Sequence, residues 1–477
     1  MIKILNTISG QKEDLVPRKN KKIQMFVCGP TVYDLSHLGH ARTFIFFDSV
    51  AKYLRYAGYK VKYVMNITDM DDRIIDRAGQ ENKTVKEVAT IYEKLFLEDM
   101  NSLRVNGVDE FARATDYIPQ IIKQVRTLIK KGNAYKIDGD GYYFDLSTFS
   151  DYGKLAGRTM LQAEDSVSRI DDGVGKRNRG DFALWKFPKE GEPAWDFDTG
   201  KYLGTATTAP AFAKATAGKP GWHIEDTAIT EHFFGSQYDI HGGAVDLIFP
   251  HHEAEIAQQE SASGRKPFVK YWLHTGFLTI NGRKMSKSLG NFTTIRDLLK
   301  RYSPEAIRLM SLSAYYRTPL DYNDNVIEQS EAGVKRIYEF VYKLGLAKGK
   351  GKESVEEKVK QARQKFSEAM NDDFNTPQAV AVVFDMVRDL NDSLTRNSLD
   401  KKSIKGIGVF LKEVDSVLGI ISSRREKIPD EVQKLAEKRE KFRKEKNWGE
   451  ADKTRTQIGD LGYEVSDTVY GPLLKRK

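Results

Sequence analysis

The chain has 477 residues, of which 40% are hydrophobic and 30% are charged, a balance typical of a globular protein with about three domains at ~150 residues each. Lysine and arginine exceed aspartate and glutamate by nine, which favours a polyanionic partner, although solubility alone accounts for the excess equally well. A single cysteine excludes an intramolecular disulfide and indicates a reducing cytoplasm. We expect no signal peptide and no membrane span, because no run of ~20 apolar residues occurs.

The first third of the chain alternates strand and helix patterns. Apolar runs predict strands at residues 25–27 and 62–67, and apolar faces repeating every three or four residues predict helices at 41–56, 85–103 and 118–131. This alternation predicts a parallel α/β sheet, in which ligands bind at the carboxyl ends of the strands.

Polar, Gly- and Asp-rich sequence between Tyr142 and Gly180 interrupts this pattern, and an apolar strand pattern follows at Asp181–Lys186. We interpret residues 142–220, approximately, as a connective insertion that divides the sheet in two. Within it, the Ala/Thr-rich stretch Thr205–Lys219 is predicted to be a surface loop. The fold resumes at Asp226 and continues to Pro319.

Long amphipathic helices follow Val326 and predict a helical bundle, with helices at 328–346, 355–370, 376–393 and 404–418. The last segment has a charged helix at 431–446, a helix at 451–461, a short strand at 463–470 and a basic tail. We therefore expect an α/β domain over 1–325, a bundle over 326–424 and a small domain over 425–477.

The motif His37-Leu-Gly-His40 falls where the first strand gives way to a helix. A helix N-terminus offers unpaired N–H groups and partial positive charge, so two imidazoles placed there face an anion such as a triphosphate. Gly39 lets a flat group approach the backbone. By itself, such a four-residue match is common by chance.

A second motif, Lys284-Met-Ser-Lys287-Ser288, lies in the Gly- and Ser-rich stretch Gly282–Asn291. Two lysines on such a stretch are suited to the charge that develops on β- and γ-phosphates, although an isolated pair is usually a solvated surface. In this order, with the first motif at a strand-to-helix turn, the two motifs indicate nucleotide chemistry.

All eight histidines lie between His37 and His274, within the expected α/β domain. His251 and Glu255 are four residues apart, so they share one face and can bind a metal together if Pro250 opens a helix. A plain surface contact is the alternative for such a pair.

In these motifs the chain resembles the class I aminoacyl-tRNA synthetases, and more narrowly the cysteinyl-tRNA synthetases. The narrower resemblance covers nearly the whole chain and rests on Phe26-Val-Cys-Gly-Pro-Thr-Val-Tyr-Asp34, Asn66-Ile-Thr-Asp-Met-Asp-Asp72, Gly221-Trp-His-Ile-Glu225, Asp239-Ile-His-Gly-Gly243 and Phe249-Pro-His-His-Glu253. It implies a Rossmann-like catalytic domain with a connective insertion, then an anticodon-binding bundle marked by Asp372-Asp-Phe-Asn-Thr-Pro377, and a small tRNA-contacting C-terminal domain.

The resemblance also implies a zinc ion held by Cys28, Asp226, His251 and Glu255. The family usually has a second cysteine where this chain has Asp226. Aspartate keeps the charge of a thiolate but is a harder ligand, so we expect a weaker zinc site, with iron, manganese or no metal as alternatives.

Zinc binds a thiol better than a hydroxyl, which would distinguish cysteine from serine where an apolar pocket separates near-isosteres by only ~1–3 kcal/mol. Cys28 would thus serve substrate binding too. Asp246 is a candidate partner for the substrate ammonium and Trp222 a candidate apolar wall, although a turn aspartate and a buried tryptophan are the plain alternatives.

The resemblance implies ATP-dependent activation of L-cysteine to cysteinyl-adenylate and transfer to tRNA(Cys), by a monomer. ATP, with Mg²⁺, would contact His37, Gly39, His40, Met285 and Lys287, and the catalytic residues would be His37, His40, Lys284 and Lys287. The alternatives are a ligase that couples cysteine to an amino-sugar, which would lack the full anticodon region, and a non-catalytic synthetase-derived RNA-binding protein, which would not need both motifs.

Overall fold

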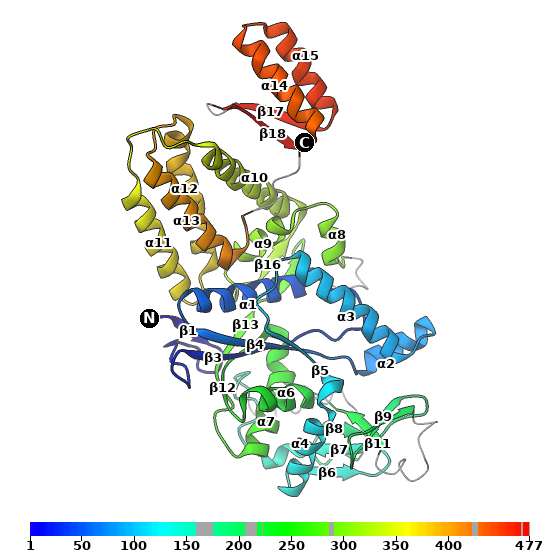
Figure 1. Cartoon of the computed structure of the whole chain (residues 1–477). Helices are drawn as coiled ribbons and strands as arrows, with labels where there is room; N and C mark the ends of the chain where they lie inside the picture. Colours follow the sequence, from blue (N-terminus) through cyan, green and yellow to red (C-terminus); the bar gives the residue numbers. More distant parts are fainter. Residues whose placement is uncertain are drawn as a thin grey trace. The chain divides into compact units, whose positions relative to one another are not determined.

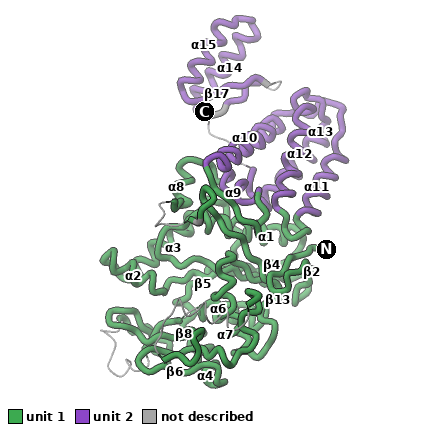
Figure 2. The backbone as a smooth tube through the Cα atoms, turned by 180° about the vertical axis from the view of Figure 1, so that it is seen from behind, with its two compact units in different colours: residues 1–304, 314–323, 370–375 green, residues 305–313, 324–369, 376–477 purple. Residues whose placement is uncertain are grey.

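A computed structural model describes residues 1–158, 175–205, 217–221, 223–285, 291–421, 428–468 and 471–476. The chain forms two compact units (Figure 2). The first contains residues 1–304, 314–323 and 370–375, and the second contains residues 305–313, 324–369 and 376–477. Within the described residues, no helix has the length and apolar character needed to cross a membrane.

The first unit is built on a five-stranded parallel sheet, as the alternating pattern predicted (Figure 1). Its strand order is β13 (Val269–Thr275), β12 (Tyr238–Ala244), β3 (Lys22–Val27), β4 (Lys60–Ile67) and β5 (Glu110–Arg113). The central strands are apolar and buried, with Met25, Phe26 and Val27 of β3 fully enclosed. The carboxyl ends of β3 and β12 therefore meet at one edge of the sheet.

Helix α1 (Leu38–Tyr56) follows β3 and lies on one side of this sheet, and α6 (Ile224–Phe234) and α7 (Glu253–Ser263) lie on the other side (Figure 1). The other helices of this unit are α2 (Asp72–Glu81), α3 (Val85–Ser102), α4 (Ile118–Lys130) and α8 (Ile295–Leu299). Helix α3 begins with a capping box, in which Thr84 and Glu87 satisfy each other's backbone N–H groups.

Between β5 and α6 the chain forms a six-stranded antiparallel sheet. Its strands, in spatial order, are β10 (Tyr202–Thr205), β9 (Pro193–Asp196), β11 (Ala217–Pro220), β8 (Phe182–Lys186), β7 (Gly141–Phe144) and β6 (Ala134–Ile137). Two small sheets complete the unit: β1 (Lys3–Asn6) with β2 (Gln11–Asp14), and β14 (Leu278–Ile280) with β15 (Arg283–Lys284) and β16 (Leu320–Tyr322).

The prediction of a surface loop over Thr205–Lys219 was wrong at both ends, because Thr205 closes β10 and Ala217 opens the buried strand β11. Residues 206–216 lie outside the described part of the chain. A β-carbon on Gly218 would fall 2.0 Å from Trp185 Nε1, so the strands approach so closely that only a residue without a side chain fits there. The small residues that suggested a loop therefore serve close packing.

The second unit is helical where the periodicity predicted it, with α9 (Pro304–Leu312), α10 (Asp324–Leu346), α11 (Glu356–Asn371), α12 (Thr376–Thr395) and α13 (Lys401–Leu418). Its last part has α14 (Asp430–Lys444), α15 (Trp448–Asp460), β17 (Tyr463–Thr468) and β18 (Gly471–Arg476). The predicted basic tail is instead strand β18, antiparallel to β17. Leu474 pairs with Val465 and is buried with Val432 and Ala436, which explains why this end of the chain is ordered as a strand.

Candidate functional site

His37 and His40 form the N-terminus of α1. His37 caps the helix: its Nδ1 accepts a hydrogen bond from the backbone N–H of His40 at 3.3 Å, and His40 Nδ1 accepts one from His37 N–H at 3.4 Å. The two rings stack with their centroids 3.7 Å apart. Since both Nδ1 atoms accept, the proton of each neutral imidazole is on Nε2.

Burial lowers the pKa of His37 to about 4, and burial together with the neighbouring His37 lowers the pKa of His40 well below its ordinary value. Both imidazoles are therefore neutral at pH 7, and they can offer Nε2–H donors to an anion rather than full positive charges. Gly39 is needed between them, because a β-carbon there would lie 2.9 Å from His37 Cε1.

The second motif comes close to the first. Met285 Cε lies 3.7 Å from the point that a β-carbon on Gly39 would occupy. The backbone of Lys284 is in β15, whereas its side chain and the whole of Lys287 lie outside the described part of the structure. The two motifs, separated by more than two hundred residues in sequence, thus lie beside each other at the start of α1.

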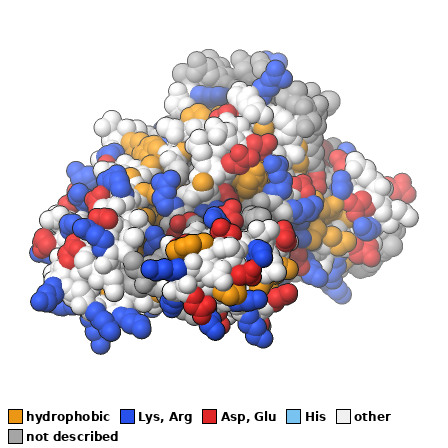
Figure 3. Space-filling view, turned by 90° about the horizontal axis from the view of Figure 1, so that it is seen from above, with side chains coloured by type: hydrophobic (Ala, Val, Ile, Leu, Met, Phe, Trp, Pro, Cys, Tyr) orange, Lys and Arg blue, Asp and Glu red, His pale blue; other side chains and the backbone are white. Residues whose placement is uncertain are grey.

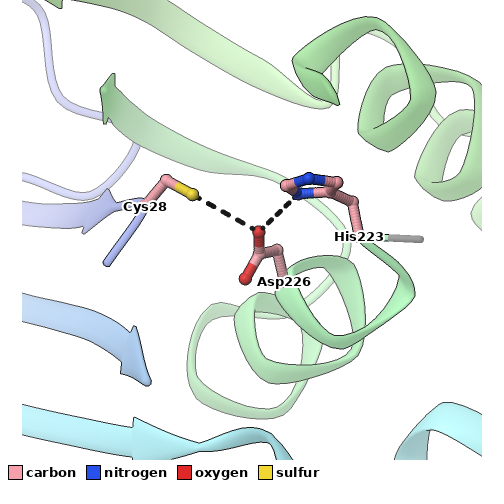
Figure 4. Close-up of side chains that lie close together, drawn as sticks. All are labelled: Cys28, His223 and Asp226. Carbon is pink, nitrogen blue, oxygen red and sulfur yellow. Dashed lines mark hydrogen bonds and ion pairs between the residues drawn. The ribbon is translucent and has the colours of Figure 1, made fainter. Parts of the chain in front are cut away.

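A second cluster lies at the carboxyl end of β3, where Cys28 is buried. Its Sγ is 3.7 Å from Oδ2 of Asp226, which is in the first turn of α6 (Figure 4). The same oxygen is 3.1 Å from Nδ1 of His223, the residue before that helix. The structure thus brings Cys28 and Asp226 together, and it adds His223, which the sequence interpretation did not include.

Glu255, in α7, is also buried in this region. Its Oε1 is 3.6 Å from His223 Nδ1 and its Oε2 is 3.6 Å from His241 Nδ1. Neither Glu255 oxygen, nor Asp226 Oδ1, accepts a hydrogen bond within the described residues. Buried carboxylate oxygens without donors are costly, and they are the groups that a bound cation would satisfy.

His251 lies next to His223, with the ring centroids 4.4 Å apart. The expectation that Pro250 opens a helix is confirmed by the backbone: Phe249 is the one residue with non-helical angles in the helical segment Ile248–His252, which leads directly into α7. Phe249 has extended φ and ψ angles of −136° and 131°, and a residue before proline avoids the helical region. His251 and Glu255 therefore lie four residues apart on continuous helical backbone, and both side chains lie beside His223.

Behind this cluster lies a group of hydrogen-bonded imidazoles. His252 Nδ1 is 2.9 Å from His274 Nε2, and His274 Nδ1 is 2.9 Å from Thr7 Oγ1. His241 Nδ1 is 2.6 Å from the hydroxyl of Tyr238. Of the eight histidines, only His232 lies exposed on a helix face; its position in the sequence did not distinguish it from the others.

The electrostatics of the cluster are dominated by buried acids. Burial raises the pKa of the Cys28 thiol, and Asp226, Glu255 and Glu225 raise it further. Burial also raises the pKa of Asp226 to about 7. The pKa values of Glu225 and Glu255 are raised, first by burial and then by Asp226. A divalent cation among these groups would offset the cost of ionising them.

Glu225 is a further polar residue that the sequence interpretation missed. Its Oε1 accepts a hydrogen bond from Thr68 Oγ1 at 3.2 Å, and Thr68 in turn accepts one from Asn66 Nδ2 at 3.2 Å. Asn66 Oδ1 accepts from the N–H of Gly29, next to Cys28. The polar residues 223 and 225 of the quoted Gly221–Glu225 segment, directly before Asp226, were the available signal for both His223 and Glu225.

The two remaining candidates are substrate-binding residues. Asp246 is exposed in a short turn, Val245–Leu247, directly after β12. It therefore lies at the same edge of the sheet as Cys28. Trp222 lies outside the described residues.

Comparison with known proteins agrees with this geometry. Residues 14–332 match the family model described as the tRNA synthetases class I (C) catalytic domain, and residues 365–422 match the DALR domain. A solved Mycobacterium tuberculosis methionyl-tRNA synthetase in complex with methionyl-adenylate superposes with a TM-score of 0.58 at 15% identity, covering 83% of this chain and 88% of that one. A ternary complex of Agrobacterium radiobacter LeuRS, tRNA and LeuAMS gives a TM-score of 0.61 at 11% identity, covering 85% of each chain. The fold and the matched domains define a class I tRNA synthetase.

Curated relatives narrow the assignment. The cysteine--tRNA ligase of Thermococcus gammatolerans is 43% identical over 492 aligned residues, covering 100% of this chain and 99% of the relative. That of Caldicellulosiruptor saccharolyticus is 42% identical over 486 residues and covers both chains fully. The chain belongs to the cysteine--tRNA ligase family.

Proposed function

We propose that this protein activates L-cysteine with ATP to form cysteinyl-adenylate and then transfers the cysteinyl group to tRNA(Cys), releasing AMP and pyrophosphate. The observation that carries the proposal is that Cys28 directly follows β3 while His37 and His40 lie at the start of α1, the next helix. One strand-to-helix connection therefore carries both a thiol-bearing cluster and a pair of Nε2–H donors.

In the first step, a carboxylate oxygen of cysteine attacks the α-phosphorus of ATP, a new P–O bond forms, and the bond to pyrophosphate breaks. His37 and His40 hold phosphate oxygens at the N-terminus of α1, and Gly39 and Met285 adjoin the nucleotide. Lys284 and Lys287 stabilise the charge that develops on the leaving pyrophosphate, and Mg²⁺ accompanies ATP. No covalent enzyme intermediate is required, so catalysis depends on positioning and electrostatics.

We propose zinc as the metal, held by Cys28, Asp226, His251 and Glu255. The fit rests on the buried Asp226 and Glu255 oxygens that lack hydrogen-bond donors within the described residues and on the neighbouring thiol. When bound, zinc supplies a Lewis acid that prefers a thiolate to a hydroxyl. Asp246 binds the substrate ammonium, since it is an exposed carboxylate at the end of β12, and Trp222 forms an apolar wall beside it.

We propose that residues 1–325 form the catalytic domain, that residues 326–424 form a bundle that binds the anticodon of the tRNA, and that residues 425–477 also contact the tRNA. On the face shown in Figure 3, basic side chains are interspersed with acidic ones. We further propose a monomer that works in the reducing cytoplasm, where a chain with one cysteine needs no disulfide.

The test is ATP–pyrophosphate exchange with cysteine or serine, followed by charging of tRNA(Cys). We expect exchange with cysteine, little with serine, and charged tRNA. A ligase that couples cysteine to an amino-sugar would exchange but would not charge tRNA, and a non-catalytic RNA-binding protein would show neither reaction. Either of those results would overturn the proposal.

A further inference from the structure

The cluster around Cys28, Asp226 and Glu255 contains a nitrogen donor that the sequence interpretation did not include, Nδ1 of His223. His223 Nδ1 lies 3.1 Å from Asp226 Oδ2, and Cys28 Sγ lies 3.7 Å from the same oxygen (Figure 4). The candidate donor atoms of these three residues all lie within 4.8 Å of one another. They come from two elements, the end of β3 and the start of α6, which meet at the site.

The spacing suits a single ion shared by these donors. With metal–sulfur bonds of about 2.3 Å and metal–nitrogen or metal–oxygen bonds of about 2.0–2.1 Å, tetrahedral angles place sulfur and oxygen about 3.5 Å apart and nitrogen and oxygen about 3.3 Å apart. The observed 3.7 and 3.1 Å lie within a few tenths of an ångström of these distances. The Cys28–Asp226 and Asp226–His223 pairs therefore each have a separation close to that of two donors on one ion, and Cys28 Sγ and His223 Nδ1 lie within 4.8 Å of each other.

The backbone turns His223 toward the cluster. His223 has φ 55° and ψ 12°, the left-handed conformation, which residues with a β-carbon seldom adopt. Although it directly precedes α6, its side chain does not cap that helix, and its ring lies beside Asp226 instead. Two fully buried carboxylates next to it, Asp226 and Glu255, hold oxygens that accept no hydrogen bond within the described residues.

We propose that His223 Nδ1 is a metal ligand in this protein, and that it compensates for the aspartate at position 226, where the family usually has a second cysteine. Exchanging a thiolate for a carboxylate alone would harden the site and favour ions such as manganese. An imidazole nitrogen restores a borderline donor set, which favours zinc and cobalt. The function of the ion rests on the proposed cysteine activation, but the ligand assignment does not.

The test is a double-mutant cycle at positions 223 and 226, with zinc affinity measured by competition against a chelator. His223→Asn is the preferred variant because asparagine tolerates the left-handed backbone while removing the imidazole. We expect His223→Asn to weaken zinc binding at least about tenfold in the natural background. In the Asp226→Cys background, which supplies a second thiolate, the same change should weaken binding by less than about threefold.

Cobalt supplies a second readout that does not depend on activity. In the Co²⁺-loaded protein, His223→Asn should change the visible ligand-field spectrum. His232 is an exposed histidine in α6, so His232→Gln should leave both the spectrum and the zinc affinity unchanged. Circular dichroism of the metal-free variants checks that they fold. An unchanged spectrum and affinity in a folded His223→Asn protein would exclude the ligand, and equal losses in both backgrounds would exclude compensation.

The two proposals fail separately. If natural protein binds zinc through His223 but shows no cysteine-dependent pyrophosphate exchange, the proposed function is wrong and the ligand assignment stands. If exchange occurs and His223→Asn binds zinc normally, the ligand assignment alone is wrong.

Discussion

Asp373 Oδ1 accepts a hydrogen bond of 2.7 Å from the backbone N–H of Leu5, so one carboxylate joins the start of the chain to a residue 368 positions later. The hydroxyls of Tyr315 and Tyr316 donate to the same carboxylate. Residues 370–375 accordingly belong to the first unit, although they connect α11 to α12. The Asp372–Pro377 segment, read from sequence as a mark of the bundle, thus supplies an anchor for the N-terminal hairpin.

We expect Asp373→Ala to destabilise the first unit by about 3 kcal/mol, because it leaves buried donors at Leu5 and Tyr316 unsatisfied. In thermal unfolding, this corresponds to a midpoint lower by roughly 6–12 °C. The adjacent Asp372 is the matched control: its side chain is about half exposed and forms an ion pair with the exposed Lys12, so Asp372→Ala should cost about 0–1 kcal/mol. Equal shifts for the two variants would contradict the anchoring role.

Gly29 lies between Cys28 and β4, and we expect Gly29→Ala to distort the proposed zinc site around Cys28. An added β-carbon would lie 1.9 Å from the backbone oxygen of Asn66 and 2.9 Å from Met65 Cγ, so the segment that carries Cys28 must move. We expect zinc affinity to fall by at least about tenfold. Gly79→Ala in α2, which meets no atom within 4 Å, should bind zinc normally and be stabilised by up to about 1 kcal/mol. Normal zinc binding by Gly29→Ala would refute this account.

Buried histidines should make the protein sensitive to acid. Burial lowers the pKa of His274 to about 3, below the ordinary 6.5, so the unfolded chain binds its proton first. This contribution to stability is fully present above pH 6.5 and is lost as the pH falls toward 3. Near pH 5, one such histidine changes the free energy of unfolding by about 1.4 kcal/mol per pH unit, and His274→Gln should remove that slope in EDTA-treated protein. Exposed His232→Gln serves as the control, and an unchanged slope for His274→Gln would count against a buried neutral imidazole.

Asp99 should affect the pH dependence of stability in the opposite direction to His274. Its carboxylate contacts Arg296 Nε at 3.0 Å, but burial raises its pKa to about 6, above the ordinary 3.8. Its contribution to stability is therefore present below pH 3.8 and is lost as the pH rises through 6. Asp99→Asn should steepen the loss of stability on acidification by up to about 1.4 kcal/mol per pH unit near pH 5. The pH dependence of the unfolding midpoint measures this effect, and a shallower dependence in the variant would show that Arg296 outweighs burial.

Local signals explain what could be predicted from the sequence. Strand β3 could be predicted from a short apolar run, and helix α1 and the long helices α10 to α13 from the 3.6-residue periodicity, because both signals depend only on near neighbours. Cys28 and Asp226 could be paired from the resemblance, and the structure places them together.

The features that the sequence did not predict are those that depend on tertiary packing. Ala217–Pro220 forms a strand because its small residues fit against Trp185, which is distant in sequence. His223 enters the cluster through a left-handed backbone that no periodicity predicts. Each of these depends on atoms far away along the chain or on a single dihedral angle.

The order of strands in the parallel sheet also bears on how the protein is made. Strand β3 pairs with β4 on one edge and with β12 on the other, and β12 begins only at Tyr238. On the ribosome, the second edge of β3 has no native partner until some two hundred further residues have been translated, while the antiparallel strands β6 to β8 can already pair with one another. Throughout that interval Cys28, the single thiol of the chain, has neither the core that buries it nor its neighbour Asp226, so it is more accessible to oxidants during synthesis than in the folded protein.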